Sequence, residues 1–376
     1  YFVNEIYKFI NNNYNFDLNY FFCLLVVIFI CYKINRYSGF GNDATSHLLF
    51  FYLISLFLKS QNTFEDLNKM TLIATYIFLS KITLILSFAF PIISYLFFKN
   101  KNIKIFYSFS VFFLFLWLLK NILISSCLIF PIKATCVKNL EWNNNSQIIE
   151  QNILGEAWSK GWPDRSNQII TQEDFVKEFK WLKAWYSKHF KFISKIFIPY
   201  LFLIILILIL INFIKKDDFK NHSIKKKDKT RILFSLAVSL LGTLIFFLKF
   251  PLYRYGYSYL VSLFCMVSCL TIYRYDSVII KKIFKFMLII CISIFYLKQI
   301  LRITEYHSTR QLIPNIYSFD NKKEKNINKF KLIGENYKVY ISVKECMYSQ
   351  SPCTNNLEKN ISHKKILNYD MIYIKN

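Results

Sequence analysis

The chain has 376 residues, of which 54% are hydrophobic and 19% aromatic, and its mean hydropathy is +0.29. The apolar residues come in long blocks rather than at the spacing of a half-exposed helix or strand, which excludes an ordinary soluble enzyme. The net charge of +25 could indicate nucleic-acid binding, but the basic loops have no binding fold around them, so we expect no nucleic-acid partner.

Seven apolar blocks have the character of membrane-spanning helices. The clearest is residues 196–214, whose 19 uncharged residues at about 1.5 Å each cross a hydrocarbon core roughly 30 Å thick. The other six blocks are residues 20–34, 71–98, 105–124, 232–247, 258–273 and 283–297. Residues 71–98 form either one long tilted helix or two shorter passes, because Lys81 and Pro91 interrupt them. The fold class that we expect is an all-α polytopic integral membrane protein with about seven or more transmembrane helices.

Charge placement predicts how these spans are oriented. Residues 99–104 carry three lysines and no acid, and residues 215–231 carry eight positive charges against three acids. By the positive-inside rule both loops are cytoplasmic, and residues 274–282 fall on the same side when the spans alternate. The outer side then holds residues 37–47, 127–195 and 248–257, and everything after Leu297.

Four of the nine cysteines fall on this outer side. Cys127 with Cys136, and Cys346 with Cys353, have spacings that suit local disulfides in an oxidising compartment. A zinc site is the alternative, but neither pair has a histidine nearby at ligand spacing. We therefore predict two disulfides without a role in chemistry.

The outer loop, residues 125–195, is rich in tryptophan. It holds five of the six tryptophans of the chain, which are Trp142, Trp158, Trp162, Trp181 and Trp185. After Thr171, which resembles a helix N-cap, an apolar stripe predicts a helix lying on the membrane surface; its members are Phe175, Phe179, Leu182 and Tyr186. Tryptophan at this depth either anchors the chain in the headgroup layer or stacks against a sugar ring.

The C-terminal stretch is polar, lysine-rich and aromatic, with strand-like runs at residues 337–343 and 371–374. We expect a small extracytoplasmic α+β cap. The predicted domains are therefore a transmembrane helical domain at residues 1–297, which includes the outer loop, and a C-terminal region at residues 298–376. No P-loop, GxSxG, HExxH or dinucleotide fingerprint is present.

The stretch "SGFGNDATSHLLFF", residues 38–51, places an acid and a histidine four residues apart in the first outer loop. One interpretation is that Asn42 or Asp43 caps a helix that begins near Ala44. The other is that Asp43 acts as a general base toward a hydroxyl group, while His47, one turn further on the same face, binds an anionic or hydroxyl group.

The arrangement resembles the GT-C superfamily of membrane glycosyltransferases, which use polyprenyl-phosphate-linked sugars. The features that carry this resemblance are the acid in the first outer loop, the surface helix and the many spans ending in an outer cap. More closely, "GNDATSHLLFFYL", "WLLKNILISSCLIFPIKATC", "EAWSKGW", "KFPLYRYGYSYL" and "CMYSQSPCT" resemble a family of uncharacterised bacterial polytopic membrane proteins.

The resemblance implies a function and a site. The chain would transfer a sugar from a polyprenyl-phosphate donor to a glycan or lipid acceptor, on the outer face of the bacterial inner membrane. Asp43 would take the acceptor proton, and Arg254 would hold the donor phosphate. Lys249, Trp158 and Trp162 complete the expected substrate-binding set. Asn42 stands where the superfamily often has a second acid, so we expect no cofactor, although a divalent metal stays open.

Two classes without catalysis compete with this interpretation. A transporter or lipid-handling protein predicts charges inside spans and internal repeats. Lys81 and Lys285 are the only charges well inside the predicted spans, and no repeat is visible. Arg254 and Lys249 also have a plain interpretation as interfacial residues that reach the lipid headgroups. A membrane scaffold needs only such interface features.

Overall fold

The computed structural model describes residues 1–11, 17–33, 43–61, 63–97, 107–162, 170–213, 226–272, 277–308, 329–333, 337–341, 353–354, 361–366 and 369–374. The lysine loop at residues 99–104, and residues 215–225 of the second basic loop, lie outside this described part, as does Asn42. Contacts divide the chain into two units, Tyr1–Trp117 with Ile153–Leu301, and Leu118–Asn152 with Arg302–Asn376. The two are described one at a time below.

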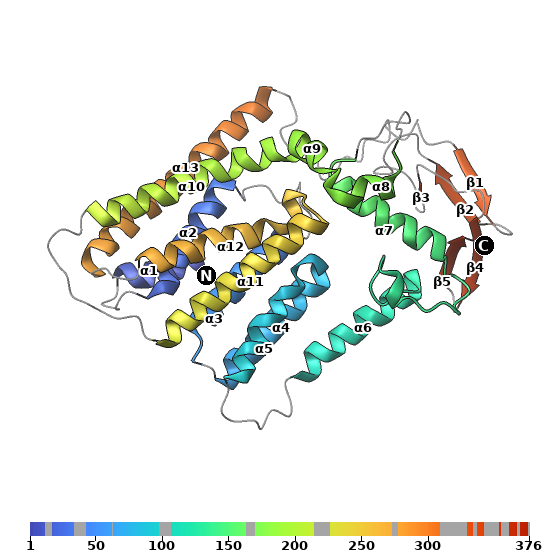
Figure 1. The fold of residues 1–376 in the computed structure, drawn as a ribbon, viewed down its shortest axis with the longest axis horizontal. Coiled ribbons are helices and arrows are strands. Elements are labelled where there is room, and N and C mark those ends of the chain that lie inside the picture. The colour runs from blue at the N-terminus through green and yellow to red at the C-terminus, as the bar shows by residue number, and fades with distance from the viewer. Residues whose placement is uncertain are drawn as a thin grey trace. The chain divides into compact units, whose positions relative to one another are not determined.

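The first unit is a bundle of helices (Figure 1). Its first helices are α1 (Phe2–Asn11), α2 (Leu18–Lys33), α3 (Asp43–Lys59), α4 (Phe64–Ser80), η1 (Ile82–Phe88) and α5 (Ala89–Leu96). Helix α6 (Tyr107–Ser125) begins in this unit and α7 (Asn145–Ser159) ends in it. The later long helices are α10 (Lys191–Phe213), α11 (Lys226–Lys249), α12 (Tyr253–Ile272) and α13 (Ser277–Ser308).

Over their described residues, all seven predicted apolar blocks are helical apart from the turn at Lys81. Three stretches are long and apolar enough to cross a membrane, namely Leu182–Ile211, Asp228–Lys249 and Ile280–Thr304. Shorter apolar helices cover Leu18–Lys33, Ile82–Leu96 and Phe109–Ser125. The mostly helical fold with candidate spans is confirmed, whereas the number of seven spans stays a prediction.

Residues 71–98 belong to two helical segments. Helix α4 ends where Lys81 adopts extended backbone angles, and η1 with α5 then returns along it. Ser87 Oγ donates to Ala74 O, and Ser94 Oγ donates to Met70 Sδ further along, so the two segments are antiparallel. The interpretation of Lys81 as a charge inside a span is wrong, because Lys81 lies at the turn. Three passes by α3, α4 and η1–α5 would be an odd number, as a single span is, so two segments in place of one do not alter the predicted sides.

Contacts identify two ends of this bundle. At the first, which we name the Asp43 end, α3 and α12 begin, α4 turns, and Tyr32 Oη at the end of α2 donates to Lys195 O at the start of α10. At the other end, Lys59 Nζ bonds Glu5 of α1, and Arg231 near the start of α11 donates to Leu58 O. The charge rule predicts that the Asp43 end faces outward.

Helices α11 and α12 lie side by side (Figure 1). They pack closely because each helix has a glycine that faces an aromatic ring of the other helix. The Cβ that a side chain would add at Gly242 falls 2.3 Å from the Tyr259 ring, and at Gly256 it falls 2.3 Å from the Phe246 ring. Such close approach through small residues is typical of helix pairs in membranes. Buried phenylalanines, among them Phe21, Phe50 and Phe90, fill the remaining core.

The predicted surface helix after Thr171 is wrong as a continuous element. Thr171 does cap a helix, since its side chain accepts from Asp174 N. The chain then breaks into α8 (Gln172–Val176), η3 (Lys177–Phe179), α9 (Leu182–Trp185) and η4 (Tyr186–Phe190). Glu178 and Phe179 have φ of 53° and 57°, the left-handed region that no regular helix of L-residues adopts. The apolar stripe is therefore interrupted after Phe175.

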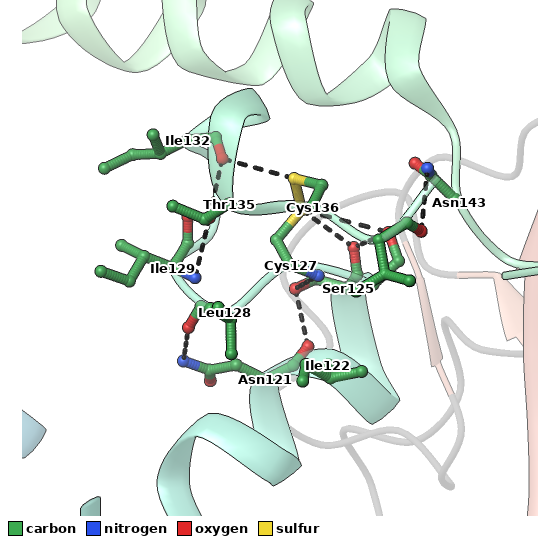
Figure 2. Close-up of a disulfide and its surroundings, with 12 residues drawn as sticks. Asn121, Ile122, Ser125, Cys127, Leu128, Ile129, Ile132, Thr135, Cys136 and Asn143 are labelled. Atoms are coloured by element: carbon green, nitrogen blue, oxygen red, sulfur yellow. Dashed lines mark hydrogen bonds between the residues drawn. A yellow bond between two sulfur atoms is a disulfide. The ribbon is translucent and has the colours of Figure 1, made fainter. Parts of the chain in front are cut away.

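The second unit contains a disulfide and small sheets. Cys127 and Cys136 are bonded, and Figure 2 shows the loop that they close, which includes η2 (Lys133–Thr135). Strands β1 (Lys329–Ile333), β2 (Tyr337–Ile341) and β3 (Cys353–Thr354) form one sheet, in which β1–β2 is antiparallel and β2–β3 parallel. Strands β4 (Ile361–Ile366) and β5 (Tyr369–Ile374) form an antiparallel pair. The strands predicted at residues 337–343 and 371–374 are confirmed as β2 and β5.

Candidate functional site

Three helix ends bring one acid and two bases together at the Asp43 end. Asp43 is the first residue of α3, Lys81 lies at the turn after α4, and Arg254 is in the first turn of α12. Lys81 Nζ lies 2.7 Å from Asp43 Oδ1, and Arg254 Nε lies 3.0 Å from Asp43 Oδ2. A carboxylate at a helix N-terminus is also stabilised by the helix dipole. These three residues are the charge triad of the following sections.

The members of the triad differ in exposure. The side chains of Lys81 and Asp43 are 5% and 14% exposed, whereas that of Arg254 is 48% exposed. Burial is the main cause that lowers the pKa of Lys81, to about 8, against the opposing effect of Asp43. The ammonium group is therefore still charged at neutral pH, and the buried pair is ionic.

Asp43 Oδ2 is not fully satisfied. Although Arg254 Nε is close in distance, the two atoms are not aligned for a hydrogen bond, and this buried oxygen accepts none from the described residues. A buried carboxylate oxygen with a nearby charge but no hydrogen bond keeps a lone pair available for a hydroxyl donor.

The guanidinium of Arg254 has capacity left as well. It lies over the Tyr255 ring, with Cζ 5.4 Å from the ring centroid, and its Nε faces Asp43. Within the described part of the chain its terminal nitrogens have no hydrogen-bond partner. A half-exposed guanidinium with two free nitrogens can bind an oxyanion through both of them.

His47 is held rather than open. Its ring is fully buried, Nδ1 lies 2.7 Å from Ser258 Oγ, and Nε2 lies 2.9 Å from the backbone oxygen of Arg254. A carbonyl oxygen only accepts, so Nε2 carries the proton and Nδ1 accepts from Ser258. Lys81 Nζ also donates to the Arg254 carbonyl. In this arrangement His47 has no nitrogen left for a ligand, and we interpret it as a residue that positions the start of α12.

Lys249 contacts a different carboxylate. Glu156 of α7 lies 3.3 Å from Lys249 Nζ and 2.6 Å from Lys160 Nζ, and the Lys160 ammonium lies over the Trp181 ring. The structure therefore brings Asp43, His47 and Arg254 together and gives Lys249 a separate partner.

Three of the five tryptophans of the outer loop, Trp162, Trp181 and Trp185, belong to a small core. Trp181 and Trp185 are buried with Phe175 and Ala157, and Trp185 Nε1 donates to Pro251 O. Trp162 packs against Phe175 with ring centroids 4.9 Å apart. Trp158 is 51% exposed, so of the two predicted sugar-stacking residues it has the open ring face.

Two predicted features depend on residues that the structure only partly covers. Cys353 is disulfide-bonded, but Cys346, its predicted partner, lies outside the described residues. Among the described residues no group of three His, Cys, Asp or Glu side chains could hold a metal ion.

The sequence interpretation missed the role of Lys81 and did not consider Glu156 or Ser258. A lone lysine in an apolar stretch is expensive without a partner, which was a signal to look for an acid. Glu156 and Lys160 have the i, i+4 spacing of a helical ion pair. No comparable signal exists for Ser258, since serine is common in membrane helices.

The comparisons with known proteins give a family but no activity. A family model described as "Domain of unknown function (DUF8201)" matches residues 1–261, which include the charge triad, His47 and Ser258. No curated protein and no solved structure matches the chain. Because the family model covers more than half of the sequence, the chain belongs to the DUF8201 family.

Proposed function

We propose that the chain is a membrane glycosyltransferase of the GT-C type in the bacterial cytoplasmic membrane. It takes a sugar from a polyprenyl-phosphate donor and transfers it to a glycan or lipid acceptor of the cell envelope. The observation that carries the proposal is the charge triad, in which a carboxylate oxygen without a hydrogen bond lies beside a half-exposed arginine.

Each group of the triad has a distinct task in this reaction. Asp43 accepts the proton of the acceptor hydroxyl, whose oxygen forms the new bond to the anomeric carbon of the sugar. The bond between that carbon and the phosphate oxygen breaks, and the phosphate leaves with the electron pair. Arg254 holds the charge that develops on the phosphate.

The ion pairs of Asp43 make the reaction depend on donor binding. Arg254 Nε lies beside Asp43 Oδ2, so the guanidinium has to turn toward the donor phosphate before an acceptor hydroxyl can reach this oxygen. Donor phosphate bound to the guanidinium competes with Asp43 for its charge. Lys81 stays in place because it is buried and also bonds the Arg254 carbonyl.

The proposal is tested with the full chain in liposomes that contain radiolabelled polyprenyl-phosphate sugars and a membrane glycan or lipid extract. The rate of transfer by Lys81→Met is compared with that by Asp43→Asn/Lys81→Met. These two variants differ only in the proposed base, and neither contains a buried Lys81 ammonium without its carboxylate. Losing a general base lowers a rate by about 10² to 10⁴, so the double variant should be nearly inactive. Lys282→Gln, far along the chain from the site, serves as the control for handling and reconstitution.

Arg254→Gln is the second arm. It should raise the donor concentration needed for half-maximal rate, since a charge-assisted contact to phosphate contributes about 1.5 to 3 kcal/mol. Equal rates in Lys81→Met and the double variant would exclude Asp43 as the base. A chain that transfers no sugar from any donor would favour a transporter or lipid-handling protein instead.

A further inference from the structure

A groove lies between α2, α10 and α13, three helices of the first unit. It is partly open to the outside of the protein and its lining is apolar; the residues used below are Ile28, Tyr32, Leu203, Met287, Ile290 and Ile294. The last three follow one face of α13, at i, i+3 and i+7. All three helices are candidate spans or shorter apolar helices, and a membrane around them would put the groove at the depth of lipid tails.

The groove leads toward lysines at the Asp43 end. Lys33 follows Tyr32 directly and lies over the Phe192 ring at 5.3 Å. Tyr32 Oη bonds the backbone oxygen of Lys195, which places the start of α10 beside the end of α2. Lys298, one turn beyond Ile294, donates to the Tyr32 carbonyl.

Two of these lysines form a like-charge pair. Lys33 is the last residue of α2, and the neighbouring Tyr32 bonds the Lys195 backbone, so the two ammonium groups are close enough for their positive charges to repel one another. Among the described residues no carboxylate pairs with either ammonium group, and residues 34–42, which follow Lys33 in the sequence, contain no acid. An anion from outside the chain would relieve the repulsion of such a pair.

We propose that this groove binds an anionic phospholipid, with one acyl chain along the apolar lining and the phosphate between Lys33 and Lys195. Lysines at many membrane surfaces reach lipid headgroups. This site differs because an apolar groove ends directly at two lysines that no carboxylate of the described residues neutralises. The site uses helices other than those of the charge triad. It therefore goes beyond the proposed function and stands whether or not the chain transfers sugar.

Native mass spectrometry of the delipidated full chain tests the headgroup part, with phosphatidylglycerol as the probe and phosphatidylcholine as the neutral comparison. The wild-type chain should retain one phosphatidylglycerol more tightly than phosphatidylcholine. Lys33→Gln/Lys195→Gln should weaken that lipid by about tenfold or more, the loss of a charge-assisted contact. Lys33→Arg/Lys195→Arg should keep it, and so should the control Lys282→Gln/Lys285→Gln on the same helix as Ile290. Equal weakening in this control, or none in the glutamine variant, would overturn the proposal.

The groove part is tested in the wild-type chain itself. Cys31 lines the groove and is half-buried, so bound phosphatidylglycerol should slow its modification by N-ethylmaleimide. Inorganic phosphate should give no protection, because it has no tail. Ile290→Trp should fill the groove and abolish both protection and the retained lipid. Protection by phosphate alone would assign the lysines to a free anion, and an unprotected Cys31 would exclude a lipid tail in this groove.

Discussion

Lys81 and Asp43 form a nearly buried ion pair between the turn after α4 and the first turn of α3, with Nζ 2.7 Å from Oδ1. Lys81 also bonds the backbone oxygen of Arg254, so this one side chain connects three helix ends. The pair therefore holds the site together as well as setting its charge. That double role changes what a substitution at Asp43 should do.

We expect Asp43→Asn to destabilise the chain, although asparagine caps a helix about as well as aspartate. Asparagine cannot neutralise the Lys81 ammonium, and removing one partner of a buried pair costs about 3 kcal/mol. Lys81→Met should have a similar cost, because it leaves Asp43 with only the half-exposed Arg254. The free energy of unfolding in detergent, from titration with a denaturing detergent, measures both.

The double variant Asp43→Asn/Lys81→Met should recover most of that loss, since no buried charge is left unbalanced. The two single losses would simply add if the ion pair contributed nothing. Lys69→Gln, which breaks an exposed ion pair with Glu65, is the matched control and should change stability by less than about 1 kcal/mol.

Much of the fold could be predicted because membrane helices are marked by uninterrupted apolar runs. The break at Lys81 could not, because proline and lysine within an apolar run leave both one helix and two open. The failure after Thr171 has a different cause. Its stripe has helical spacing, but Trp181 and Trp185 are buried against Phe247, a residue distant in sequence.

The site was predictable in its members but not in their pairing. Asp43, His47 and Arg254 were each chosen for their chemistry, and the structure brings them together. Periodicity does not show that His47 bonds the Arg254 carbonyl, or that Asp43 contacts both Lys81 and Arg254. Those contacts depend on how the helix ends meet.

His47→Phe should lower stability while leaving α3 intact. The ring would keep its packing against Tyr257, whose centroid is 3.8 Å away, but would orphan Ser258 Oγ and remove one donor to the Arg254 carbonyl. An unsatisfied buried group costs about 1 to 3 kcal/mol. Ser258→Ala leaves only one buried group, His47 Nδ1, without its partner, whereas His47→Phe affects two, so this milder control should lose about 1 kcal/mol. A larger loss in the free energy of unfolding for Ser258→Ala than for His47→Phe would contradict this account.

Cys127→Ser/Cys136→Ser should destabilise the second unit. The bond closes a loop with a sequence separation of 9, and the chain-entropy model gives about 2 to 3 kcal/mol for a loop of that size. Limited proteolysis should show faster cleavage within residues 118–152 in the variant, with unchanged cleavage of residues 226–272. Equal protection of the loop in both proteins would mean that packing alone maintains it.

The orientation inferred from the lysine runs predicts a labelling pattern. Cysteine introduced at Lys183, which is exposed, should react in intact cells with a thiol reagent that does not cross membranes. Cysteine at Lys229, exposed near the start of α11, should react only after the cells are opened. These substitutions are best made after replacing the native half-buried Cys31 by serine. Labelling of Lys229→Cys in intact cells, without labelling of Lys183→Cys, would reverse the predicted topology.

The last prediction concerns the contact between α11 and α12 that positions Arg254. At Gly242 an added Cβ would lie 2.3 Å from the Tyr259 ring, and that ring is buried and fixed by its hydroxyl, which donates to Thr83 O. Gly242→Ala should therefore destabilise the chain by about 1 to 3 kcal/mol, as overpacking does, despite the higher helix propensity of alanine.

Gly155→Ala in α7 is the matched control. Nothing lies within 4 Å of the added Cβ there, so helix propensity alone acts and the variant should be more stable by up to about 1 kcal/mol. Because Tyr259 bonds the turn region through Thr83, displacing its ring in Gly242→Ala should also loosen Lys81 and Asp43. Opposite signs for the two glycine variants in the same unfolding titration are the expected result. A stabilising Gly242→Ala would show that α11 and α12 are further apart than their close packing implies.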